Sequence, residues 1–84
     1  MTKTIGSRRQ RVLLAILVGI REKAGLTQRD LAERLKWPRS KVAKIETGEQ
    51  RIDAIECIIW AKGCEVRPQA FFLLLCRTLE RARL

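Results

Sequence analysis

Glycine and proline divide this 84-residue chain into five segments in which apolar residues recur at helical spacing. No segment alternates between apolar and polar residues, as a half-buried strand would. We therefore predict an all-α fold of five helices, over residues 7–24, 28–35, 38–47, 54–62 and 68–82.

The charge of the chain is high and unevenly distributed. The net charge is +9, and residues 1–44 hold twelve basic and three acidic side chains, whereas residues 45–84 hold six of each. Evenly solvated charge does not account for this asymmetry, so we expect the first half to bind an anionic partner. The chain has only two phenylalanines and two tryptophans, which disfavours the base stacking used in single-stranded RNA recognition.

The residue types that enzymes and metal sites need are sparse. Histidine is absent, and there is no Ser-His-Asp, Cys-His or glycine-rich phosphate motif, so we expect neither an enzyme nor a cofactor. Cys57, Cys64 and Cys76 form no CxxC pair, so we expect no metal site. The isoleucines around Cys57 are more typical of core packing than of redox sensing.

Two apolar stretches raise the question of a membrane or a signal peptide. Val12–Ile20 and Ala70–Cys76 are both too short to span a bilayer. No signal-peptide cleavage site follows the first stretch before the charged residues 21–23. We therefore expect a cytoplasmic protein with no membrane contact.

Residues 27–48 have the pattern of a helix-turn-helix. Thr27 is a good N-cap, and Ala32 is small enough to let two helices cross closely. Pro38 suits the first turn of the second helix. The outward face of that helix holds basic, small and hydroxyl residues and no acid: Arg39, Ser40, Lys41, Ala43, Lys44 and Thr47. Because arginine and lysine donate to O6 and N7 of guanine, we predict that helix 38–47 reads the major groove.

The run GLTQRDLAERLKWPRSKVAKIETGEQR, residues 25–51, resembles the helix-turn-helix of the phage repressor and Cro family, the XRE-type regulators. The shared motifs are Gly-Leu-Thr-Gln at 25–28, Leu-Ala at 31–32 and Ile-Glu-Thr-Gly at 45–48. The resemblance implies one five-helix, lambda-repressor-like DNA-binding domain over residues 1–84. The match itself covers roughly residues 9–66, with the helix-turn-helix at 27–48. From the residues outside it we expect a basic arm at 1–8 and a dimerisation helix at 68–82.

The resemblance also implies roles for individual residues. The positions that match base readers are Arg39, Ser40 and Lys44. The positions expected at phosphates are Gln28, Lys41, Thr47 and Arg51. The basic start of the chain separately predicts that Arg9 lies along phosphates or in a minor groove. The arm has an alternative interpretation as ordinary solvated charge. Arg21 and Glu46 match a structural ion pair.

The turn of the motif departs from the family, because Lys36 stands where many relatives have glycine. Two outcomes are open. Lys36 adopts the left-handed conformation at a cost of roughly 1 kcal/mol, or the loop rearranges around Trp37 and Pro38.

The helix predicted at 68–82 is apolar around more than half of its circumference. We expect it to form a homodimer interface, together with part of residues 58–60, through Phe71, Phe72, Leu75 and Leu79. The alternative is that these residues close the core of a monomer.

Together, these features predict a sequence-specific regulator of transcription that binds double-stranded DNA. We expect a repressor that acts as a homodimer on a pseudo-palindromic operator, since two copies contact twice as many bases. An alternative is an antitoxin-type DNA-binding protein whose apolar last helix also binds a partner toxin. A controller protein of a restriction–modification system is a variant of the first class that gene context would decide.

Overall fold

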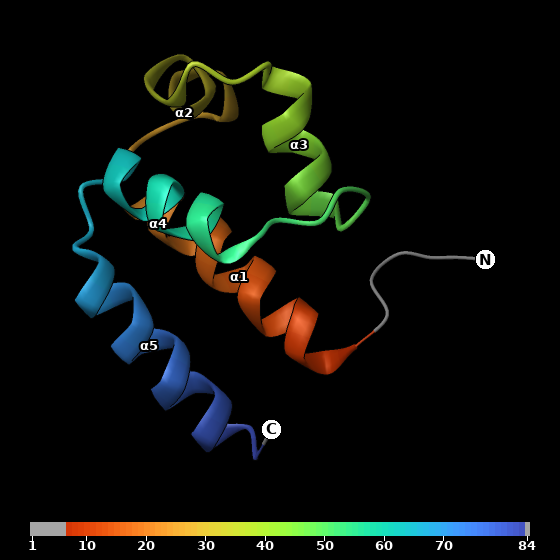
Figure 1. The fold of residues 1–84 in the computed structure, drawn as a ribbon, viewed down its shortest axis with the longest axis vertical. Coiled ribbons are helices and arrows are strands. Elements are labelled where there is room, and N and C mark those ends of the chain that lie inside the picture. The colour runs from red at the N-terminus through yellow and green to blue at the C-terminus, as the bar shows by residue number, and fades with distance from the viewer. Residues whose placement is uncertain (1–6, 84) are drawn as a thin grey trace.

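A computed structural model describes residues 7–83, and within them the chain forms five helices and no strand (Figure 1). The all-α prediction is confirmed, and each helix end lies within one residue of its predicted position. The helices are α1 (Arg8–Lys23), α2 (Gln28–Leu35), α3 (Arg39–Thr47), α4 (Ala54–Gly63) and α5 (Pro68–Arg81). No helix in this range is long and apolar enough to cross a membrane.

Helices α2 and α4 begin at capping boxes. The Thr27 hydroxyl accepts from the backbone N–H of Asp30 at 3.0 Å, and the Asp30 carboxylate accepts from the N–H of Thr27 at 2.9 Å. Asp53 and Glu56 make the same exchange at 2.7 and 3.1 Å. These bonds satisfy amides that a helix start leaves without partners, and so they fix where α2 and α4 begin.

The turn between α2 and α3 contains a strained residue. Lys36 has φ 60° and ψ 38°, which is the left-handed conformation that favours glycine. The next N–H, of Trp37, reaches back to the carbonyl of Ala32 at 3.0 Å and closes the end of α2. Of the two outcomes considered for this turn, Lys36 therefore takes the left-handed one.

The core is centred on Trp60, which is completely buried in α4. Its indole N–H donates to the carbonyl of Leu17 in α1 at 3.1 Å, so its one polar group is satisfied. The other largest fully buried side chains come from α1, α2, α3 and α5: Leu17, Leu31, Val42, Ile45 and Phe71. Helix α1 packs against α3, α4 and α5 and thereby joins α3 to the rest of the protein.

The cysteines at positions 57 and 64 lie in this core. Burial raises the pKa of both thiols, that of Cys64 to about 11. A protonated, buried thiol is a poor nucleophile, so the core-packing prediction for Cys57 is confirmed.

Helix α5 divides its apolar residues between the core and the surface. Phe71 is 1% exposed and belongs to the core of the protomer, so its prediction as a dimer-interface residue is wrong. Leu75, one turn later, is half-buried against the same core, because residues four apart share a helix face. Phe72, Leu73 and Leu74 are 46%, 53% and 42% exposed. The alternative of a closed monomer core therefore accounts for Phe71 and Leu75 but not for these three.

The strain at Lys36 predicts that Lys36→Gly stabilises the protein by about 0.5–1 kcal/mol, since glycine reaches φ 60° without a Cβ clash. Urea unfolding followed by circular dichroism measures this change. Glu33→Gly, an exposed change inside α2, is the matched control and should lower stability by about 1 kcal/mol. Destabilisation by Lys36→Gly would contradict the strained turn.

The capping boxes predict a loss of stability in acid. Hydrogen bonds with Thr27 lower the pKa of Asp30. The pKa of Glu56 is lowered mainly by its hydrogen bond from Lys41 and, to a smaller extent, by the one from the backbone of Asp53. A depressed folded-state pKa stabilises the protein above the unfolded-state pKa, near 4, and this contribution is lost as the pH falls further. Glu56→Gln should therefore flatten the decline of melting temperature below about pH 4. If the melting temperature of Glu56→Gln fell with pH as steeply as that of the wild type, the acid sensitivity would not come from Glu56.

Candidate nucleic-acid interface

Helix α3 has one buried side and one side that faces solvent. Val42 and Ile45 are completely buried and hold α3 against the core. The three predicted base readers, Arg39, Ser40 and Lys44, are all exposed. The first two lie in the first turn of α3, where the helix would enter a groove first. The three predicted base readers are therefore all accessible to a partner that approaches α3.

A hydrogen-bonded ion pair joins three helices behind this surface. Arg21 of α1 donates from Nε and Nη2 to the carboxylate of Glu46 in α3, at 2.6 and 3.1 Å. Arg21 also donates to the carbonyl of Leu26 at 2.7 Å, and the Gln28 amide of α2 donates to Glu46 at 2.8 Å. The bond to Glu46 raises the pKa of the Arg21 guanidinium. The expected pair is thus present, and it includes Gln28, which was expected at a phosphate.

An open pocket of about 500 Å³ lies at the start of α2, lined by Arg21, Thr27, Gln28, Arg29 and Arg39. Its rim combines two exposed guanidinium groups with a helix N-terminus, and both favour a phosphate. Arg29 was not among the predicted site residues. Its neighbour in the pocket, Arg39, is ten positions away in the sequence, and only the crossing of α2 and α3 brings them together.

The remaining predicted phosphate residues are distributed over several parts of the surface. Thr47, at the end of α3, is exposed, and its hydroxyl donates to the carbonyl of Lys44 at 3.0 Å. Arg51 is exposed in the loop before α4. Arg9 is exposed in the first turn of α1, far from α2 (Figure 1). Residues 1–6 of the predicted basic arm lie outside the described residues.

Lys41 does not point outward as a phosphate contact should. Its ammonium group donates to the Glu56 carboxylate of α4 at 2.7 Å and lies 4.2 Å from the ring centre of Trp37. Both partners belong to the protein, and the side chain is 24% exposed. The sequence could not indicate this, because Lys41 and Glu56 meet only when α3 packs near the start of α4.

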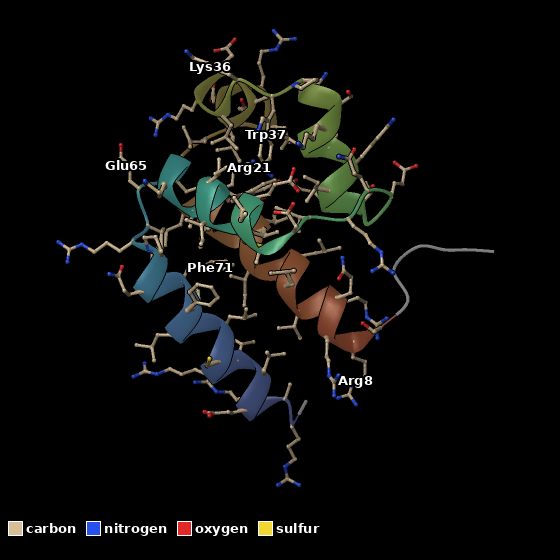
Figure 2. All side chains as sticks on the ribbon, in the orientation of Figure 1. Arg8, Arg21, Lys36, Trp37, Glu65 and Phe71 are labelled. Carbon is tan, nitrogen blue, oxygen red and sulfur yellow. The ribbon has the colours of Figure 1, made fainter. Side chains whose placement is uncertain are left out.

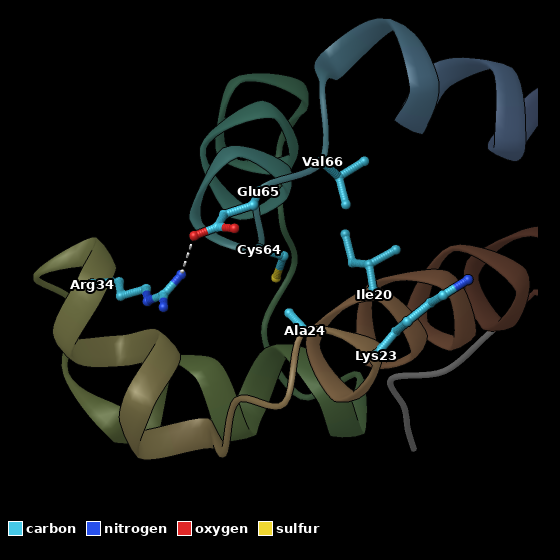
Figure 3. A pocket seen from close by; sticks show the side chains of 7 residues that line it. All are labelled: Ile20, Lys23, Ala24, Arg34, Cys64, Glu65 and Val66. Carbon is cyan, nitrogen blue, oxygen red and sulfur yellow. Dashed lines mark ion pairs between the residues drawn. The ribbon is translucent and has the colours of Figure 1, made fainter.

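A second pocket, of about 320 Å³, lies between the end of α1, α2 and the turn after α4 (Figure 3). Arg34 donates to the carbonyl of Gly63 at 2.9 Å and forms an exposed ion pair with Glu65 at 3.5 Å. The buried thiol of Cys64 faces this space. Within residues 7–83, no cluster of acidic and cysteine side chains could hold a metal ion.

Comparisons with known proteins agree with this geometry. A family model described as a helix-turn-helix domain matches residues 13–83. The structure of an XRE-family like protein from Pseudomonas syringae pv. tomato str. DC3000 shares 38% identity, covers 83% of this chain and 85% of its own, and has a TM-score of 0.78. No curated protein matches the chain.

Two further similar structures are of the restriction–modification controller protein C.Esp1396I. The wild-type protein shares 26% identity over 86% of this chain and 95% of its own, with a TM-score of 0.78. The structure of its tetramer in complex with its natural 35-base-pair operator has the same identity, coverages and TM-score.

The fold and the exposed face of α3 define a DNA-binding regulator of transcription. The chain belongs to the XRE-type helix-turn-helix family, as its sequence motifs predicted.

The ion pair predicts that Glu46→Ala lowers stability by about 3 kcal/mol, because the variant leaves the largely buried Arg21 guanidinium without its carboxylate. Thermal unfolding measures the loss. Glu49→Ala, an exposed change of the same charge two residues beyond α3, should alter stability by less than about 0.5 kcal/mol. Equal melting temperatures for the two variants would contradict a structural role for Glu46.

Proposed function

We propose that this protein is a homodimeric repressor that binds a pseudo-palindromic DNA operator with one α3 helix in each half-site. The observation that carries the proposal is the exposed first turn of α3 beside the cationic pocket at the start of α2. A helix fits the major groove, and a pocket of this charge fits the flanking phosphates.

In this proposal the solvent-facing side chains of α3 contact the bases. Arg39 and Lys44 donate to the acceptors of guanine, and the Ser40 hydroxyl both donates and accepts. Residues that flank α3 bind phosphates: Arg29 and the start of α2 on one side, and Thr47 and Arg51 on the other. Because Gln28 already bonds to Glu46, its contribution to a phosphate comes through its backbone N–H.

Dimerisation explains the apolar surface of α4 and α5. Ile55 and Ile59 of α4 and Phe72, Leu73 and Leu74 of α5 are exposed, and the two helices pack against each other. Leu79 is half-buried one turn after Leu75, on the same side of α5 as Phe72 two turns earlier. In our proposal a second copy covers these residues, and the two α3 helices bind half-sites one helical turn, about 34 Å, apart, as in other helix-turn-helix dimers. The similar controller protein is a tetramer on its operator, which supports an assembly of copies.

Sedimentation equilibrium tests the assembly. We expect a dimer at tens of micromolar for the wild type and a monomer for Phe72→Glu. Arg67→Glu, a change at an exposed residue just before α5, should remain a dimer. A monomeric wild type would overturn the homodimer and leave the apolar face to another protein, such as a toxin.

Selection from a random duplex library at about 150 mM salt tests the DNA-binding function. An enriched inverted repeat is expected, and reporter expression should fall when that repeat overlaps a promoter. Enrichment of no sequence would overturn sequence-specific binding, and increased reporter expression would overturn repression.

Arg39→Ala should lower affinity for the enriched duplex by about 1–3 kcal/mol and relax the preference at one base position in each half-site. Competition binding with duplexes that differ at single positions measures both effects. Arg77→Ala, an exposed change on α5, serves as the control and should alter neither. If Arg39→Ala weakened all duplexes equally, Arg39 would be a phosphate contact instead.

A further inference from the structure

The lysine at position 41 lies between two groups that are themselves held in place. On one side its ammonium group lies over the ring of Trp37, a residue labelled in Figure 2. The centre of that ring lies 6.3 Å from that of the completely buried Trp60. On the other side Lys41 donates to Glu56 Oε2, while Oε1 of the same carboxylate accepts from the N–H of Asp53. Lys41 therefore connects α3 to the turn before it and to the start of α4.

The first turn of α3 has few other restraints. Its N-cap is Pro38, which offers no side-chain hydrogen bond, and the turn before it contains the strained Lys36. The completely buried residues of α3 are Val42 and Ile45, and both follow Lys41. The position of the first turn, which carries Arg39 and Ser40, thus depends on contacts made by Trp37 and Lys41.

We propose that Trp37, Lys41 and Glu56 form a positioning cluster that holds the first turn of α3 in the orientation needed to read bases. Lys41 acts through Arg39 and Ser40 and does not contact phosphate. This inference rests on the proposed function, because it assigns part of the sequence preference of α3 to residues away from the DNA.

Two roles for Lys41 predict opposite effects of Glu56→Gln. The glutamine still accepts from the N–H of Asp53 but no longer pairs with the lysine charge. If Lys41 positions α3, the variant loses affinity for the enriched duplex. If Lys41 contacts phosphate, removal of the neighbouring negative charge leaves affinity unchanged or raises it for every duplex.

The test compares the enriched duplex with a scrambled duplex of equal composition, each titrated over a range of salt concentrations. We expect Glu56→Gln and Lys41→Met to weaken binding to the enriched duplex about five- to tenfold, without reducing affinity for the scrambled duplex. The dependence of log affinity on log salt should keep its slope on both. Lys41→Arg retains the charge over the tryptophan ring and beside the carboxylate, so its affinity for the enriched duplex should lie within about twofold of the wild-type affinity.

Two control variants calibrate the measurement. Glu80→Gln makes the same charge change near the end of α5 and should leave both affinities unchanged. Arg29→Gln removes a proposed phosphate contact and should reduce the salt slope by about one on both duplexes. The positioning role is overturned if Lys41→Met reduces the slope as Arg29→Gln does, or if Glu56→Gln binds the enriched duplex as tightly as the wild type.

Amide hydrogen exchange separates this inference from the proposed function. Glu56→Gln should accelerate exchange at the amides of Val42 and Ala43 in α3 and leave those of α1 unchanged. The measurement needs no DNA, so it remains decisive if the library yields no enriched sequence. Unchanged exchange in α3 would overturn the positioning cluster.

Discussion

The arrangement of the helix-turn-helix depends on the carboxylate of Glu46. This carboxylate lies in α3 and accepts hydrogen bonds from Arg21 of α1 and Gln28 of α2. A largely buried charge of this kind is costly to leave unpaired, so the three helices keep one arrangement. That arrangement forms the cationic pocket at the start of α2 and leaves the outer side of α3 exposed. In the function that we propose, the ion pair therefore contributes to DNA recognition without contacting DNA.

The two ends of α3 are held by different chemistry. The end near Thr47 is held by the ion pair of Glu46, and its centre is held by the buried Val42 and Ile45. The beginning is held by the lysine between Trp37 and Glu56. Both sets of contacts lead back to α1, through Arg21 at one end and through Trp60 and the carbonyl of Leu17 at the other. Helix α1 is thus the common support for a short helix that could not hold its position alone.

The sequence predicted features that depend on neighbouring residues and missed those that depend on packing. Helix ends were predicted to within one residue because capping residues and glycines act locally. The pair of Arg21 and Glu46 was expected only through the family resemblance. The contact of Lys41 with Glu56 and the burial of Phe71 were missed, because each depends on which face of a helix meets another helix. Arg29 was missed for the same reason, since its pocket forms where α2 and α3 cross.

Methylation interference on the enriched duplex tests most directly whether α3 reads bases in the major groove. Methylation of guanine N7 places a group on an acceptor that lies in that groove. We predict that it blocks binding at guanines in both half-sites, and that Arg39→Ala becomes insensitive to one of these guanines in each half-site while the others still interfere. Interference confined to minor-groove adenine N3, or none at any base, would contradict recognition of the major groove by α3.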